Sequence, residues 1–445
     1  MDWKNQLTKT PYLVLFIVLI VVGVGTASAL ITITLAGNVN ITGDADIDGG
    51  LNVDGPITGF ETLEGLNCAT DRLAKFDGDN WVCVKLTVQN DSIITVDSAV
   101  NVGQYTSIVI GSDNLPVISY YDVVSTRLKV AHCGNAMCSS GNTITTVAPT
   151  ATGEYSSIAI GADNLPVISY RSGTGDLKVL RCINLLCNTS YNVSLVDSID
   201  NVGAYTSIAI GTDNNPVISY YDETNGSLKV AHCGNATCSS GNILNIADNT
   251  ADVVGKYTSI AIGSDDMPVI SYYDETNGNL KLLHCGTTAC NGLNTITTLQ
   301  SAGDIGTYSS IAIGSDGNPV ISYIHDGSLR IIHCGNQLCD SGNSVIFGDT
   351  VIFGDSILYT SIATGSNNNP MISYFANNAA DLKVLRCGNV TCSSGNIITT
   401  VDFQGVVGQH SSIVIGSDGN PVISYYHFNR GDLKVAVEGS ILIFE

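Results

Sequence analysis

The sequence predicts an all-β fold, a seven-bladed β-propeller of four-stranded blades. A segment of about 50 residues recurs seven times after residue 100, which is typical of a propeller, a solenoid or an array. Each copy contains short β-branched and aromatic runs separated by Gly, Asn and Asp, and no copy has a competing helical period. One proline marks the same place in every copy: Pro116, Pro166, Pro216, Pro268, Pro319, Pro370 and Pro421.

Each copy is expected to form four strands, which in the third copy fall at 207–211, 217–221, 228–233 and 243–246. The first two runs are apolar or small on both faces, as expected for inner strands that neighbouring blades cover. An open β-solenoid is the alternative. Solenoid repeats are usually shorter and end in a polar cap, which the seventh copy lacks, so a closed ring is favoured.

Two segments compete to close the ring, and the sequence does not decide between them. Residues 92–98 (SIITVDS) resemble a fourth strand that has no first three before it, so they would complete the last blade from the N-terminal side. Residues 441–444, close to the C-terminus, would serve equally well as the fourth strand of the seventh copy.

The chain before the propeller (92–445) divides into three segments. Residues 1–36 place Lys4 and Lys9 before a long apolar run, which indicates a signal peptide cleaved after Ala29 or, our preference, a transmembrane anchor. Both alternatives put the propeller outside the cell. Residues 37–64 form a Gly-rich β stalk or spacer, and a stalk would allow a homotrimer. Residues 65–91 form a disulfide hairpin linker.

Fourteen cysteines occur at regular places, and they indicate disulfides in an oxidising compartment. Twelve form six pairs at one spacing, each expected to join strands three and four of a blade; zinc binding is the less favoured alternative. Two more lie in the hairpin linker. The expected pairs are Cys68 with Cys83, Cys133 with Cys138, Cys182 with Cys187, Cys233 with Cys238, Cys285 with Cys290, Cys334 with Cys339, and Cys387 with Cys392.

The charge balance limits the partners. The chain has 18 Lys+Arg against 40 Asp+Glu, a net charge of −22, which disfavours nucleic acid. We see no basic patch for anionic lipid, so membrane contact is expected only through the N-terminal segment. A glycan or a surface protein of unknown identity remains as the expected partner.

Residues that recur in every copy are interpreted as structural. The serine of strand one has no Gly-x-Ser-x-Gly elbow, and the neighbouring tyrosines (His410 in the seventh copy) are expected to pack as wedges. The histidines before the first cysteine of a pair are expected on a polar outer face. The Asp/Asn turns between strands one and two are interpreted as hairpin turns, so no cofactor is expected, although calcium elsewhere on the acidic surface stays open.

A binding site is expected where the copies disagree, because a site on a pseudo-symmetric ring needs different groups on different blades. The loops between strands two and three differ most. They share one rim with the connections between blades, and loops are common places for function. The candidate ligand residues on this rim are Arg171, His325, His427 and Arg430, with Phe428 beside them.

Asn-x-Ser/Thr sequons indicate glycosylation if the host has the machinery. They occur at Asn40, Asn90, Asn188, Asn192, Asn225, Asn235 and Asn389.

The run SIAIGSDGNPVISY, together with LKVAHCGN and CSSGN, resembles repeats of uncharacterised archaeal and bacterial cell-surface proteins, loosely grouped with sialidase-like propellers. The resemblance spans residues 100–437 and implies a propeller. It does not carry over sialidase activity, because the Asp-box pattern is missing and no Trp follows Trp81. Residues 65–84 resemble Cys-to-Cys hairpins that join stalks to downstream domains in bacterial, archaeal and phage surface proteins.

These observations lead to a first hypothesis of a membrane-anchored extracellular propeller that binds a ligand for adhesion or organises the envelope. No catalytic constellation is identifiable, so the chain is not expected to be an enzyme. The first alternative is an extracellular polysaccharide hydrolase or lyase, which would need converging carboxylates on one rim. The second is a purely structural envelope component.

Overall fold

The computed structural model describes residues 72–76, 81–85, 92–148, 152–248, 250–301, 303–349 and 356–438. The chain divides into two compact units, 87–443 and the remainder. Of the smaller unit, the structure describes an antiparallel hairpin of β1 (Arg72–Phe76) and β2 (Trp81–Lys85). The predicted anchor and stalk, together with Asn40 and Asn90, lie outside the described residues.

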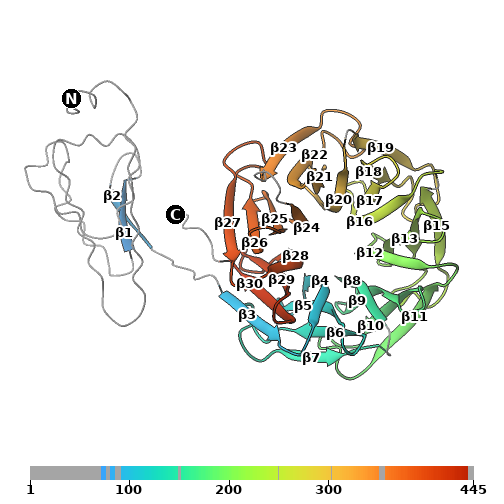
Figure 1. Cartoon of the computed structure of the whole chain (residues 1–445), viewed down its shortest axis with the longest axis horizontal. Helices are drawn as coiled ribbons and strands as arrows, with labels where there is room; N and C mark the ends of the chain where they lie inside the picture. Colours follow the sequence, from blue (N-terminus) through green and yellow to red (C-terminus); the bar gives the residue numbers. More distant parts are fainter. Residues whose placement is uncertain are drawn as a thin grey trace, which may run out of the picture. The chain divides into compact units, whose positions relative to one another are not determined.

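The predicted seven-bladed propeller of four-stranded blades is confirmed (Figure 1). Blade 1 contains β4 (Val102–Ile110), β5 (Pro116–Asp122), β6 (Arg127–His132) and β7 (Thr143–Thr146). Blade 2 contains β8 (Thr152–Ile160), β9 (Pro166–Ser172), β10 (Leu177–Cys182) and β11 (Tyr191–Asp197). Blade 3 contains β12 (Val202–Ile210), β13 (Pro216–Asp222), β14 (Ser227–His232) and β15 (Ile243–Asp248).

The other four blades repeat this order. Blade 4 contains β16 (Val254–Ile262), β17 (Pro268–Asp274), β18 (Asn279–His284) and β19 (Thr295–Gln300). Blade 5 contains β20 (Ile305–Ile313), β21 (Pro319–His325), β22 (Ser328–His333) and β23 (Ser344–Asp349). Blade 6 contains β24 (Ile357–Thr364), β25 (Pro370–Ala376), β26 (Asp381–Arg386) and β27 (Ile397–Asp402). Blade 7 contains β28 (Val407–Ile415), β29 (Pro421–His427), β30 (Asp432–Val437) and β3 (Ser92–Asp97).

The N-terminal strand β3 closes the ring. It pairs antiparallel with β30, with Ser92 opposite Val437 and Ile94 opposite Val435, so that both ends of the propeller meet in one blade. The structure thus settles the question that the sequence left open. The competing segment, 441–444, lies outside the described residues.

The innermost strands are tied to one another around the axis by the recurring serine. Each serine hydroxyl accepts a hydrogen bond of 3.2 Å from a backbone N–H of the next blade, and the seven bonds form a closed circle. The serines are Ser107, Ser157, Ser207, Ser259, Ser310, Ser361 and Ser412. The structural role expected of this serine is thus specific, because its hydroxyl satisfies a donor that the neighbouring strand leaves unpaired.

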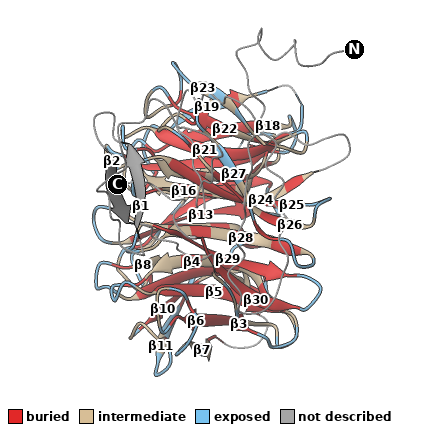
Figure 2. Cartoon of the chain, turned by 90° about the vertical axis from the view of Figure 1, so that its left-hand side faces the viewer, coloured by how far each residue is buried: buried red, intermediate tan, exposed pale blue. Residues whose placement is uncertain are grey.

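Apolar cores lie between adjacent blades, where the two middle strands are almost wholly buried (Figure 2).

Five of these interfaces also contain what we call the inter-blade triad. An Asp at the end of strand four accepts a hydrogen bond from a buried Tyr of the next blade and forms an ion pair with a Lys of that blade. The triads are Asp97/Tyr120/Lys129, Asp197/Tyr220/Lys229, Asp248/Tyr272/Lys281, Asp349/Tyr374/Lys383 and Asp402/Tyr425/Lys434.

The six predicted disulfides between strands three and four are confirmed, one in each of blades 1 to 6. In each pair the second cysteine lies five residues after the first, in the loop that leads to strand four. The bonds join Cys133 and Cys138, Cys182 and Cys187, Cys233 and Cys238, Cys285 and Cys290, Cys334 and Cys339, and Cys387 and Cys392. So many disulfides point to an oxidising, extracellular environment.

The seventh predicted disulfide, in the hairpin linker, is not tested. Cys83 lies in β2, opposite Ala74 of β1, which agrees with the predicted hairpin. Its expected partner Cys68 lies outside the described residues, so the bond between Cys68 and Cys83 stays a prediction.

In the parts of the chain that the structure describes, no helix is both long and apolar enough to cross a membrane. The apolar N-terminal run lies outside those parts. The N-terminal anchor therefore stays a prediction.

Candidate functional site on the variable face

Antiparallel strands bring the turns between strands two and three to the same face as the connections between blades; we call it the variable face. Backbone hydrogen bonds lock each connection between two of these turns. In blade 3, Glu223 N donates to Asn201 O (2.8 Å), and Val202 N donates to Gly175 O of blade 2 (2.8 Å). Residues on the loops of adjacent blades are thereby held close together on this face.

A closed ring of aromatic side chains surrounds the propeller axis. Neighbouring ring centroids lie 4.5–4.8 Å apart through all seven blades. The members are Tyr105, Tyr155, Tyr205, Tyr257, Tyr308, Tyr359 and His410, and each has a φ of 51–56° at a register shift in strand one. The predicted wedge packing therefore takes the form of an axial ring, which lines a cavity of about 190 Å³.

The axial ring is uncharged at neutral pH. Burial, followed by repulsion from Tyr155 and Glu154, raises the pKa of Tyr105, and the Tyr257 hydroxyl is hydrogen-bonded to those of Tyr205 and Tyr308. Desolvation lowers the pKa of His410 to about 4, so its imidazole is neutral at pH 7. The ring offers half-buried aromatic edges and hydroxyls, which suit a polar, uncharged ligand.

The residue that precedes each member of the axial ring differs among the blades. That position is occupied by Gln104, Glu154, Ala204, Lys256, Thr307, Leu358 and Gln409 in blades 1 to 7. Its cross-strand partner on strand two also changes, from tyrosine in four blades to Arg171 in blade 2, Ile324 in blade 5 and Phe375 in blade 6. The blades therefore differ in chemistry immediately around the axis.

A charged constellation lies on blades 2 and 3 beside the axial ring. Arg171 Nη1 donates to Glu154 Oε2 (3.0 Å), and Nη2 donates to Glu223 Oε2 (3.0 Å) and to Asn201 Oδ1 (2.7 Å). Asn201 Nδ2 also donates to Glu223. The side chains of Glu154, Arg171 and Glu223 are 37%, 18% and 32% exposed, so both carboxylates are fixed and yet accessible.

The charges continue into blade 4 and then give way to apolar groups. Lys256 Nζ contacts both carboxylate oxygens of Glu275 (2.7 Å each) and lies 5.7 Å from the centre of the Tyr221 ring. Blades 5 and 6 present Ile324 and the Leu358/Phe375 pair at the equivalent positions. One side of the axis is charged and the other is apolar.

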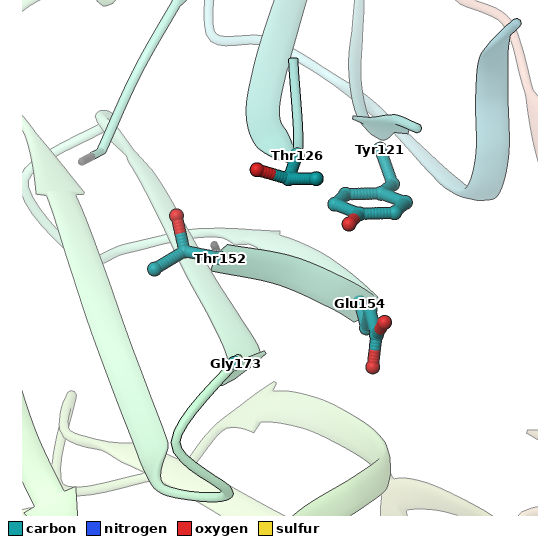
Figure 3. A pocket seen from close by; sticks show the side chains of 5 residues that line it. All are labelled: Tyr121, Thr126, Thr152, Glu154 and Gly173. Carbon is teal, nitrogen blue, oxygen red and sulfur yellow. The ribbon is translucent and has the colours of Figure 1, made fainter. Parts of the chain in front are cut away.

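A pocket of about 200 Å³ opens between blades 1 and 2 next to Glu154. Tyr121 and Thr126 line one side of it, while Thr152 and Glu154, both from β8, line the other, and Gly173 completes the wall (Figure 3). Burial, followed by the charges of Glu154 and Asp122, raises the pKa of Tyr121. Glu154 therefore forms part of the wall of a space that a ligand can enter.

The structure does not bring the four predicted rim residues together. Arg171 belongs to the charged constellation just described. His325 Nε2 lies 3.4 Å from its neighbour Asp326 on blade 5. His427 is buried and accepts a hydrogen bond from the Arg430 backbone N–H (3.3 Å), while the Arg430 side chain is exposed on blade 7. Their ligand role stays a prediction.

The histidines of strand three are not on an outer polar face, as the sequence suggested, but buried against the turns between strands one and two. The four distances from His Nε2 to the turn Asp Oδ2 are 2.8–3.1 Å, for His132–Asp113, His232–Asp213, His284–Asp265 and His333–Asp316. The turn carboxylates are thus already bound by protein groups. Among the described residues, no three His, Cys, Asp or Glu side chains cluster closely enough to hold a metal.

The described sequons differ in access. Asn188, Asn192 and Asn225 are exposed. Asn235 and Asn389 are used locally, since each side chain accepts a hydrogen bond from a backbone N–H of its cysteine loop, from Ser239 and Ser393. Glycosylation stays a prediction.

No protein-family model matches the chain, and no curated protein is similar to it. Among solved structures it is similar to an ulvan lyase bound to a -[GlcA(1-4)Rha3S]- saccharide, with a TM-score of 0.50, 10% identity, and coverage of 77% of this chain and 95% of that chain. It is also similar to an arabinanase from Penicillium chrysogenum (TM-score 0.44, 8% identity, 78% and 97% covered) and an arabinofuranosidase from Fusarium graminearum (TM-score 0.46, 8% identity, 78% and 97% covered).

The ulvan lyase, which has a similar fold and is catalytic, contradicts the expectation that the chain is not an enzyme. A propeller fold of this kind is therefore compatible with catalysis. At this identity the likeness shows the fold alone, and the chemistry has to be argued from this chain's own residues. The resemblance to archaeal and bacterial surface repeats stays a prediction beyond its propeller fold.

Proposed function

We propose that this protein is an extracellular enzyme that cleaves a polysaccharide on the variable face, with Glu154 and Glu223 as the reacting carboxylates. One observation carries the proposal. Two accessible carboxylates are held around one guanidinium on blades 2 and 3, beside a pocket and an aromatic ring. Blade 4 has a carboxylate, Glu275, at the position of Glu223, but it has Lys256 at the position of Glu154. The polysaccharide-cleaving alternative thereby replaces adhesion as the first hypothesis.

The arrangement suits hydrolysis. Glycoside hydrolysis generally needs a pair of carboxyl groups, one as nucleophile or base and one as acid. Arg171 binds Glu154 and Glu223 through different nitrogens, so both are held in fixed positions. Glu154 lines the pocket and is assigned the role of nucleophile or base, and Glu223 is assigned the complementary role. The half-buried tyrosines of the axial ring supply apolar faces on which sugar rings stack.

Elimination from a uronic acid polysaccharide is less well supported, although the ulvan lyase shares the fold. A uronate substrate needs a positive group to neutralise its carboxylate. The two cations beside the axial ring, Arg171 and Lys256, are each already bound by carboxylates of the protein. The overall charge of −22 also opposes an anionic polymer. We therefore infer that the substrate is a neutral polysaccharide.

The experiment is digestion of neutral and uronate-containing polysaccharides by the purified, oxidised full-length protein. Two products are measured: new reducing ends, which either reaction creates, and the ultraviolet absorbance of unsaturated uronate, which only elimination creates. New reducing ends from a neutral polymer without unsaturated product are expected. Unsaturated product would reject hydrolysis in favour of elimination. No new reducing ends from any polymer, beside a digesting reference enzyme, would reject the enzyme proposal.

A further inference from the structure

The wall between blades 4 and 5 departs from the pattern of the inter-blade triads. In five walls the Tyr hydroxyl and Lys Nζ share one Asp carboxylate, as in Asp248 with Tyr272 (2.7 Å) and Lys281 (3.0 Å). At the equivalent register position, opposite the first leucine of strand three, blade 4 has Gln300 in place of Asp. The carboxylate is missing from this wall.

The groups that would bind that carboxylate are still present in blade 5. Tyr323 is fully buried, and its hydroxyl has no hydrogen-bond partner among the described residues. Arg330 takes the place of the triad lysine, opposite Tyr323 on the neighbouring strand. Its Nε and Nη1 are buried, and they too have no partner in the described part of the chain. Its guanidinium carbon lies 3.5 Å from the centre of the Phe347 ring, which fixes the plane of the group.

Buried donors without an acceptor are costly, and a buried charge without a counter-charge is more so. A neutral side chain such as Gln300 cannot compensate a guanidinium. Burial raises the pKa of the Tyr323 phenol, and the positive charge of Arg330 opposes part of that rise. The two groups therefore lie within electrostatic reach of each other. Three buried donors without a described partner, together with one positive charge, therefore stand at the strand positions whose equivalents bind a carboxylate in five other walls.

We propose that a small monovalent anion, chloride or a carboxylate the size of formate, binds between blades 4 and 5. The Tyr323 hydroxyl and Arg330 Nε and Nη1 are its donors. The anion occupies the place that Asp248 or Asp402 occupies in other walls and ties blade 4 to blade 5.

The wall between blades 1 and 2 provides the contrast within the same molecule. There too a buried hydroxyl, that of Tyr170, has no partner among the described residues. The cation of that blade, Lys178, is 3.8 Å from Asp176 of its own blade. Without an unpaired cation, this second wall is not expected to hold an anion.

The test is thermal unfolding of the full-length, oxidised protein at constant ionic strength, with bulky gluconate replaced stepwise by chloride or by formate. A ligand that binds only the folded state raises the unfolding temperature as its concentration rises. We expect a rise of a few degrees for the wild type in chloride, in formate or in both, and the arm with the larger rise identifies the preferred anion.

Three variants make the result specific. Gln300→Asp restores the missing carboxylate, so its unfolding temperature should be higher in gluconate and independent of chloride and formate. Arg330→Met removes the charge and should also lose the dependence, whereas Tyr170→Phe, the matched change at the other wall, should keep it. Equal unfolding temperatures of the wild type in all three anions would overturn the proposal. So would an undiminished dependence in Arg330→Met or Gln300→Asp.

Discussion

The walls between the blades and the variable face are made from the same seven repeats, but they use them in opposite ways. In the walls the same residue recurs at the same place: the serine circle joins all seven blades, and five walls hold an Asp/Tyr/Lys triad. On the variable face, the position before the axial ring changes from Glu154 to Ala204 to Lys256 in successive blades.

This difference separates residues that stabilise the propeller from residues that are candidates for its function. A residue that recurs seven times satisfies a need that every blade has, such as an unpaired N–H or a buried hydroxyl. The combination of Glu154, Arg171 and Glu223 occurs once among the described blades, although Glu275 of blade 4 corresponds to Glu223, so the combination serves no need that all blades share. Changes in the walls should therefore act on stability, and changes on the variable face should act on activity.

The largest expected effect on the walls comes from acid, which acts on three triads at once. Burial by itself raises the pKa of Asp248, but hydrogen bonds from Tyr272 and Lys281 outweigh it and leave the pKa below its ordinary value of 3.8. Asp97 and Asp402 are lowered in the same way. A lowered pKa adds stability above the ordinary pKa, which is lost as pH falls through the lowered value. The urea midpoint should fall steeply below about pH 4.

The second effect is that of a single triad. Asp248→Ala leaves the Tyr272 hydroxyl buried without its acceptor and leaves Lys281 with only the Asp274 carboxylate, 3.7 Å away. It should lower the free energy of unfolding by roughly 1–3 kcal/mol at pH 7. Urea unfolding of wild type and variant measures it. The variant should also show a weaker acid transition, because one of the titrating carboxylates is gone. A loss below about 1 kcal/mol would contradict the role given to the triads.

The smallest effect is expected from a Tyr→Phe substitution, whose cost in unfolding free energy is compared between two walls. Tyr220→Phe removes a hydroxyl that donates to Asp197 over 2.8 Å, whereas Tyr170→Phe removes one that has no described partner. The first should cost about 1 kcal/mol of unfolding free energy, and the second should be close to neutral. Since both tyrosines are fully buried, the loss of the oxygen from the packing is matched. Equal costs would mean that the hydrogen bond from the Tyr220 hydroxyl to Asp197 contributes nothing to stability.

The fold was predictable because the same four-strand pattern occurs in seven successive copies. The choice of closing strand could also have been made: Asp97 follows Val96 just as Asp197 follows Val196 and Asp402 follows Val401, and in blades 2 and 6 this Asp ends strand four. The sequence alone did not reveal why an Asp is needed there. The reason is the Tyr and Lys of the next blade, which lie 23 and 32 residues further along the chain.

The site was only partly predictable. Arg171 was singled out by its place in a divergent loop. Glu154 is its cross-strand neighbour in blade 2, whereas Glu223 lies 52 residues away and is brought to it by the packing of blade 3 against blade 2. Aligning the residue before each axial tyrosine would have shown the disagreement among blades. Sequence alone could not show that one guanidinium binds both carboxylates, because that depends on how side chains lie across two blades.

The most direct test of the account is to measure Glu154→Gln for both polysaccharide cleavage and unfolding free energy. Asp340→Asn, the same loss of a carboxylate in the exposed cysteine loop of blade 5, is the matched control. We expect Glu154→Gln to lose activity by roughly 100-fold or more while its unfolding free energy stays within about 1 kcal/mol of wild type. Asp340→Asn should keep both. Full activity in Glu154→Gln, or a loss of activity matched by a loss of stability, would contradict the account.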